Sequence, residues 1–98
     1  MNSDVKCSFV YHGKILPVEE LVVETMRSAG FRKTNSMPVG TCVNTIYAHD
    51  DGARLEHCRV QRNNWGSDKF LGYGTPNTLG EVIRRIEGVY AEVAKKRK

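Results

Sequence analysis

The sequence lacks the long apolar run that a membrane protein requires. No stretch approaches the roughly 20 consecutive apolar residues that cross a bilayer, and residues 1–6 are polar where a secretory signal would be apolar. With 98 residues, 40% of them apolar and 27% charged, the chain has the length and composition of one soluble domain. We therefore expect a single compact domain over residues 1–98, with no membrane partner and a cytoplasmic location.

Cysteine is scarce and shows no pairing pattern. Cys7, Cys42 and Cys58 are an odd number with no two-residue spacing, which excludes a disulfide framework and a zinc knuckle. They are typical of reduced, mostly buried thiols, and a Cys42–Cys58 bridge across a hairpin is the alternative. The histidines and cysteines show none of the close ligand pairs of a zinc site, and the run Asp50, Asp51, Gly52 lacks the alternating acids of a calcium loop, so we expect neither a metal nor a cofactor.

The chain also lacks a recognisable catalytic set. Cys58 with His49 or His57 would supply a nucleophile and a base, but adjacent residues of a strand point to opposite faces, which separates Cys58 from His57. Three glycines between 72 and 80 have the wrong spacing for a phosphate-binding loop, and Glu81 would repel a phosphate there. We therefore expect a noncatalytic protein.

The clearest pattern that is present predicts a helix over residues 75–95. Thr78 and Glu81 form a capping box at its start, with Pro76 just before it. The apolar residues recur at steps of three and four, which places them on one buried side of the helix: they are Leu79, Val82, Ile83, Ile86, Val89, Tyr90 and Val93.

A strand and a second helix are predicted in the first 30 residues. Alternation of apolar residues from Val5 to Tyr11 indicates a strand with one buried face. A helix is expected to enter at Pro17 and to end at Gly30 in the left-handed conformation. Its apolar stripe consists of Val18, Leu21, Val22, Met26 and Ala29. Loop-forming residues over 32–40 predict a linker.

The middle of the chain predicts a three-strand meander. Residues 42–48 and 54–62 are rich in strand formers and flank Asp51 and Gly52, which favour a tight hairpin turn. If those two residues form the turn, Val43, Thr45 and Tyr47 face the core together with Glu56, Cys58 and Val60. The opposite face then carries Asn44, Ile46, Ala48, Leu55, His57, Arg59 and Gln61. A third strand is expected over 69–73.

These elements predict an α+β fold in the order β-α-β-β-β-α. Two amphipathic helices need an apolar partner, and an antiparallel sheet of 3–5 strands offers one buried face. Both helices are therefore expected on the same face, which leaves the other open to solvent or to a partner.

The element order is similar to that of two nucleic-acid-binding families. Phe70, Leu71, Gly72 and Tyr73, followed by Thr78, Leu79 and Glu81 at a helix start, resemble the sheet-plus-helix DNA-binding modules of some recombinases and plant transcription factors. This resemblance implies an exposed sheet face in the major groove. The helix, three strands, helix order is also similar to double-stranded RNA-binding domains, but the basic cluster of that family is absent from the start of this second helix.

The positive charge gathers at the C-terminus. The net charge of +4 corresponds to the tail at 95–98, and the rest of the chain is balanced. These cations complement the negative end of a helix dipole, and they also suit a nucleic acid or another anionic surface.

Together these features predict a small binding protein that contacts nucleic acid or a nucleoprotein complex through the open sheet face and the basic tail. The expected contact residues are Arg59, Gln61, Arg62, Asn64, Trp65, Lys69, Lys95, Lys96, Arg97 and Lys98. The alternative is a protein-binding inhibitor or adaptor of the phage or mobile-element type, which would use a strand edge or a patch of Ile46 and Leu55. The same patch would also allow a homodimer.

Overall fold

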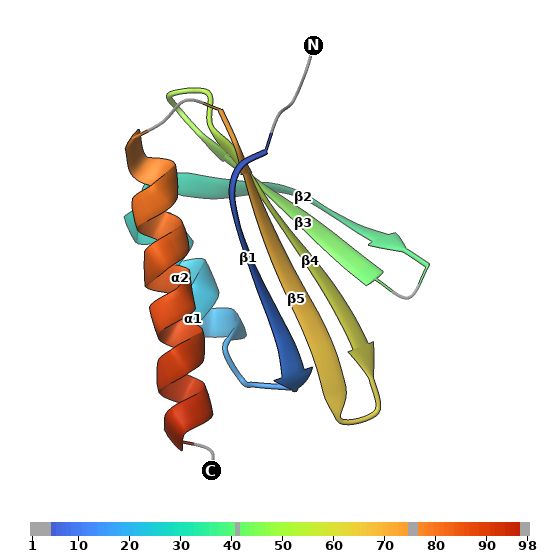
Figure 1. The fold of residues 1–98 in the computed structure, drawn as a ribbon. Helices are drawn as coiled ribbons and strands as arrows, with labels where there is room; N and C mark the ends of the chain where they lie inside the picture. The colour runs from blue at the N-terminus through green and yellow to red at the C-terminus, as the bar shows by residue number, and fades with distance from the viewer. Residues whose placement is uncertain (1–4, 41, 75–76, 97–98) are drawn as a thin grey trace.

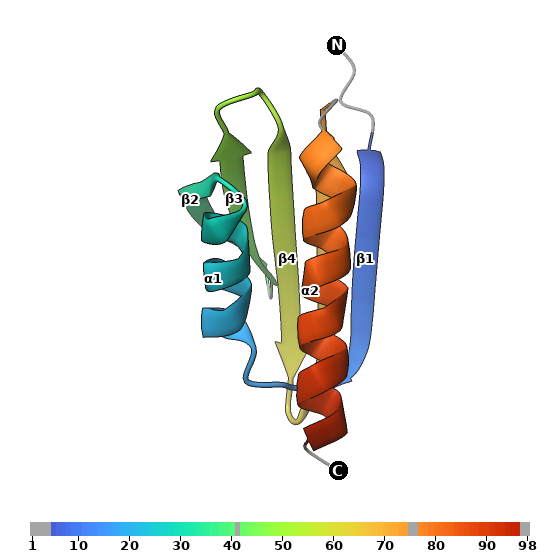
Figure 2. The ribbon, with the colours of Figure 1, turned by 90° about the vertical axis from the view of Figure 1, so that its left-hand side faces the viewer.

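The computed structural model describes residues 5–40, 42–74 and 77–96. The described elements are β1 (Val5–Lys14), α1 (Glu19–Ser28), β2 (Phe31–Val39), β3 (Cys42–His49), β4 (Arg54–Arg62), β5 (Trp65–Tyr73) and α2 (Asn77–Lys96). The strands form one antiparallel five-stranded sheet in the order β1-β5-β4-β3-β2. Both helices lie on the same face of this sheet, as Figures 1 and 2 show. The predicted α+β class is confirmed.

The order of the strands follows from the path of α1. This helix lies over the inner face of the sheet and connects β1 at one edge to β2 at the other (Figure 2). Hairpins from β2 to β5 then bring the chain back across the sheet, so that β5 pairs with β1 and β4. The first and last strands are therefore neighbours.

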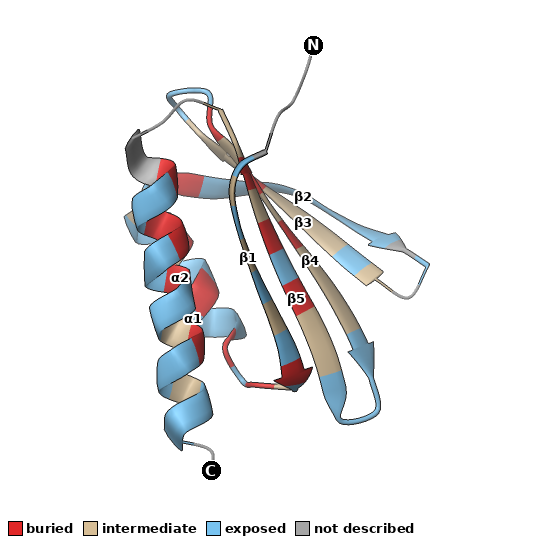
Figure 3. Ribbon diagram, viewed as in Figure 1, coloured by how far each residue is buried: buried red, intermediate tan, exposed pale blue. Residues whose placement is uncertain are grey.

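The predicted stripe of α2 is confirmed as part of the core. Leu79, Ile86 and Tyr90 are almost fully buried, while Val89 and Val93 are partly buried at the edge of the same cluster. The buried side of α2 faces the sheet and its other faces are exposed (Figure 3). The predicted Pro76 lies outside the described residues, as does the side chain of Thr78.

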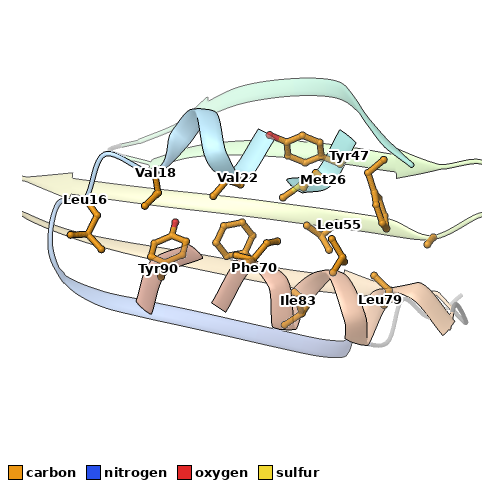
Figure 4. Packing of buried hydrophobic residues seen from close by; sticks show 14 residues of the cluster. Leu16, Val18, Val22, Met26, Tyr47, Leu55, Phe70, Leu79, Ile83 and Tyr90 are labelled. Atoms are coloured by element: carbon orange, nitrogen blue, oxygen red, sulfur yellow. The ribbon is translucent and has the colours of Figure 1, made fainter. Parts of the chain in front are cut away.

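The core is a continuous layer between the sheet and the two helices (Figure 4). Phe70 of β5 lies at its centre, with its ring centroid 5.9 Å from that of Tyr90. Phe9 of β1 packs against both rings, at 6.1 Å and 5.3 Å. Such contacts add to the free energy gained by burying the ring surface. Among the described helices, none is long and apolar enough to span a bilayer.

Helix α1 follows the prediction with two exceptions. It begins at Glu19, with Val18 at the N-cap, two residues after the predicted entrance at Pro17, and it buries Val22 and Met26. Leu21 is 47% exposed and does not join the buried stripe. Gly30 ends the helix at φ +93°, the predicted left-handed conformation, and the next residue, Phe31, is buried.

The predicted linker over residues 32–40 is wrong, because this segment forms strand β2. Arg32 to Pro38 are all exposed, and the strand pairs with β3 at the edge of the sheet. A bulge between Lys33 and Asn35 interrupts the register. An exposed edge strand needs no apolar alternation, so its sequence resembles that of a loop.

The predicted register of the β3–β4 hairpin is wrong by one residue. The turn holds three residues, Asp50, Asp51 and Gly52, because His49 pairs with Ala53 and Gly52 adopts φ +97°. This is the three-residue hairpin whose last turn residue is left-handed. Thr45 therefore pairs with His57 and Val43 with Arg59. One additional turn residue exchanges the two faces of β4.

Candidate functional site

The sheet has one face that the helices do not cover. On β5, Asp68, Phe70 and Gly72 are buried towards the helices, so that Trp65, Lys69 and the other alternating residues point away from them. In the part of the chain that the structure describes, no helix or loop lies over this outer side (Figures 1 and 2). We call this side the open face.

Basic residues surround an exposed tryptophan at one end of the open face. Trp65 pairs with Lys14 of β1 on one side and with Arg62 of β4 on the other, so the three residues form one row across three strands. Directly opposed residues have Cβ atoms about 5 Å apart. Lys69 lies on the same strand and the same face. We call Lys14, Arg62, Trp65 and Lys69 the Trp65 cluster.

The tryptophan of this cluster is positioned for contact with a partner. Trp65 is 54% exposed, although it is the largest side chain of the sheet. The ring of His12 lies 6.0 Å from its centroid, tilted by 40°. Because Trp65 points away from the core, burial within the domain does not account for its place.

The Trp65 cluster carries an uncompensated positive charge. Elsewhere on the open face Arg54 pairs with Glu56 at 3.2 Å, and Arg32 pairs with Asp50 at 3.0 Å. Among the described residues, none of the three cluster cations has an acidic partner within ion-pair distance. This end of the sheet therefore attracts anions.

The structure brings three of the predicted contact residues, Arg62, Trp65 and Lys69, together on the open face. Asn64 is exposed in the turn beside them. Lys95 and Lys96 are exposed at the end of α2, which lies in the helix layer but towards the same end of the molecule as the β4–β5 turn (Figure 1). Residues 97 and 98 of the predicted tail lie outside the described chain.

The predicted placement of Arg59 and Gln61 on the open face is wrong. Both residues face the helices, because the three-residue turn exchanges the faces of β4. Arg59 therefore points away from Arg62, and the two do not form one surface. Leu55 changes face with them and is fully buried in the core, so the predicted patch of Ile46 and Leu55 does not exist.

On the helix side, Arg59 belongs to a buried charge network. Its Nε donates to Asp68 Oδ1 at 2.9 Å, and its Nη1 donates to Glu19 Oε2 at 2.7 Å. The same Asp68 oxygen shares a hydrogen bond with His57 Nε2 at 3.1 Å. Asp68 is 3% exposed and His57 is 8% exposed. The network ties the first residue of α1 to β4 and β5.

The electrostatics of Asp68 depend on these partners. Burial acts to raise the pKa of its carboxyl, but the hydrogen bond from His57 and the charge of Arg59 outweigh burial and hold the pKa below its ordinary value. Asp68 therefore stays ionised at neutral pH. Its charge is already engaged by two neighbours, which is typical of a structural ion network.

A cavity of about 380 Å³ lies beside this network, between α1 and the inner face of β3 and β4. Its walls combine apolar Val22 and Val43 with the polar side chains of Lys33, Thr45 and Gln61. The size is within the range of small-molecule pockets. The charged side chains of Arg59 and Glu19 in its wall are paired with each other. They are therefore less available to bind a ligand than the unpaired cations of the open face.

The comparisons with protein-family models, curated proteins and solved structures gave no match to this chain. Within the described residues, no group of three or more histidine, cysteine, aspartate or glutamate side chains is placed to hold a metal ion. The geometry of the open face is therefore the basis for assigning a function.

Two of the three cysteines lie on the open face. Cys42 and Cys58 alternate with core-facing residues on paired strands. Both are free thiols, and burial, followed by contact with Cys42, raises the pKa of Cys58. A raised pKa disfavours the reactive thiolate. The third, Cys7, is half-buried against the core.

Sequence reasoning missed Lys14 and Asp68. Lys14 follows the predicted first strand and shares the alternation that points His12 outward, so a longer strand would have placed it on the open face. Asp68 precedes the predicted third strand by one residue, whereas β5 begins at Trp65. Both were missed because the observed strands are longer than the predicted ones.

Proposed function

We propose that this chain is a small noncatalytic protein that binds nucleic acid, or a complex containing it, through the open face. The observation that carries the proposal is the row of Lys14, Trp65 and Arg62, with Lys69 on the same face four residues further along β5. The lysines and the arginine neutralise phosphates, and the exposed indole stacks on a base. Asn64 in the adjacent turn adds an amide of the kind that reads base edges.

The basic end of α2 supports the same role. Lys95 and Lys96 extend the positive potential towards the end of the molecule that carries the Trp65 cluster. They lie in the helix layer and not on the open face, so they contribute long-range attraction and not direct contacts. Such attraction raises the rate of association and weakens with salt.

The test is the salt dependence of binding to fluorescently labelled oligonucleotides, measured by anisotropy. Three phosphate contacts predict that affinity falls about 20- to 40-fold when salt rises from about 50 to about 200 mM. Replacing Arg62 or Lys69 with glutamine removes one contact and lowers the salt slope by about 1. Binding that is unchanged by salt would contradict the proposal.

The matched control is Lys33→Gln. Lys33 is also an exposed cation on a strand, but it faces the helix side of the sheet. The control removes the same net charge from the opposite face. We expect its affinity to fall by much less than that of Arg62→Gln. An equal loss in both variants would mean that net charge, and not the open face, determines binding.

The second candidate function is a protein-binding inhibitor or adaptor. It is favoured by strand β2 at the edge of the sheet. Among the described residues, β2 pairs with β3 on one side and with no strand on its other side. An extended segment of a partner protein adds to such an edge through backbone hydrogen bonds. Affinity capture from a cell extract, with and without nuclease, separates the two functions. A partner lost after nuclease supports nucleic-acid binding, and a protein that stays bound supports the alternative.

A further inference from the structure

The width of the open face restricts the nucleic acid that it accepts. Five strands with a spacing of about 4.8 Å span about 19 Å from β1 to β2. The major groove of B-form DNA is about 12 Å wide and admits a helix or a narrow ribbon of strands. A five-stranded face is therefore too wide to enter this groove flat.

The Trp65 cluster also has the arrangement that suits an unpaired base. Trp65 is 54% exposed, and stacking on its indole requires a base whose own face is accessible. In a duplex the faces of the bases are covered by their neighbours. Lys14 and Arg62 lie on either side of Trp65, where the phosphates before and after a stacked nucleotide would pass.

We infer that the open face binds single-stranded nucleic acid, with one base stacked on Trp65, the flanking phosphates on Lys14 and Arg62, and a phosphate further along the nucleic-acid strand on Lys69. This inference rests on the proposed function and specifies its ligand. Val10 of β1 pairs with Lys69 and is 54% exposed, like Trp65. It adds apolar surface to the open face, on which the bound nucleic acid would lie.

The chain contains a direct reporter of this contact, because Trp65 is its sole tryptophan. The experiment titrates the protein with an oligothymidylate of about 12 nucleotides, a length within the site sizes of known single-strand binders. A duplex of the same length is the comparison. We expect the single strand to bind at least about tenfold more tightly than the duplex and to quench the fluorescence of Trp65.

Two variants test the stacking itself. Because neither variant contains a tryptophan, their affinities are measured by the anisotropy of a labelled oligonucleotide. Trp65→Ala is expected to weaken single-strand binding by about 5- to 150-fold, whereas Trp65→Phe keeps an aromatic face and most of the affinity. The control is Val43→Ala, since Val43 is 47% exposed but lies on the helix side of the sheet. Trp65 is largely outside the core, so these variants are expected to retain the circular dichroism of the wild type.

The possible outcomes separate the inference from the function on which it rests. Duplex binding that is salt-sensitive and at least as tight as single-strand binding would overturn the inference and leave the proposed function standing. Equal affinity of Trp65→Ala and the wild type for the single strand would overturn the stacking contact. Failure of both oligonucleotides to bind at low salt would overturn the inference and the proposed function together.

Discussion

Replacing Asp68 with asparagine is expected to destabilise the fold strongly. Asp68 is 3% exposed and accepts hydrogen bonds from the side chains of Arg59 and His57. The asparagine side chain fits the same space but removes the negative charge. Arg59, whose side chain is 14% exposed, then lacks its buried counter-ion and keeps only Glu19, which is 72% exposed.

The magnitude follows from the loss of one partner of a buried ion pair, which costs about 3–5 kcal/mol. Because Arg59 keeps its contact with Glu19, we expect the lower end, about 3 kcal/mol of unfolding free energy. For a domain of this size that corresponds to a fall of about 12 to 24 °C in Tm. Urea unfolding followed by circular dichroism measures the free energy directly.

The pH dependence of this difference tests its electrostatic origin. The pKa of Asp68 is held below its ordinary value of 3.8 in the folded state. Its contribution to stability is therefore fully present at pH values above that ordinary value, and it is lost as the pH falls through the folded pKa. The difference between wild type and Asp68→Asn should shrink as the pH falls below about 4.

The matched control is Asp50→Asn. Asp50 also pairs with an arginine, Arg32, at 3.0 Å, but both side chains are more than two thirds exposed. An exposed pair contributes about 0–1 kcal/mol. If Asp68→Asn costs no more than this control, or if its cost does not change with pH, the assignment of Asp68 as a buried counter-ion is refuted.

Two glycines give predictions of opposite sign. Gly30→Ala should destabilise the protein by about 1–2 kcal/mol or more. The reason is that Gly30 has φ +93° and that a Cβ there would lie 2.7 Å from His49 Nε2. A Tm equal to that of the wild type would contradict this prediction. Gly88→Ala should stabilise the protein by about 0.5–1 kcal/mol, because alanine has a higher helix propensity than glycine. A Cβ on this residue of α2 would meet no atom within 4 Å, so the added methyl group fits without strain. A Tm lower than that of the wild type would contradict this prediction.

The sequence predicted those parts of the fold whose burial follows a clear period. The stripe of α2 and the alternation of β1 have the periods of a helix and of a half-buried strand, so both were identified. Strand β2 was missed because its exposed residues include Asn35, Ser36 and Pro38, which are also typical of loops. Its strand character comes from pairing with β3, which no local pattern shows.

The candidate site was predicted only in part, for a similar reason. Arg62, Trp65 and Lys69 lie close in sequence and were grouped correctly. Arg59 was assigned to the wrong face because turns of two and three residues share the same Asp-Gly signal. Lys14 reaches the site through the pairing of β1 with β5, which links residues about 50 positions apart.

The pairing of β1 with β5 also has a consequence for how the domain folds. Among the described strands β1 pairs only with β5, so on a growing chain it stays unpaired until β5 has been made. The loop that must close to join them contains most of the domain, and contacts of such long sequence separation slow folding. A chain ending before Trp65 would leave Phe9 without Phe70 beside it, so we expect truncated chains to remain unfolded and the complete domain to fold in one cooperative step.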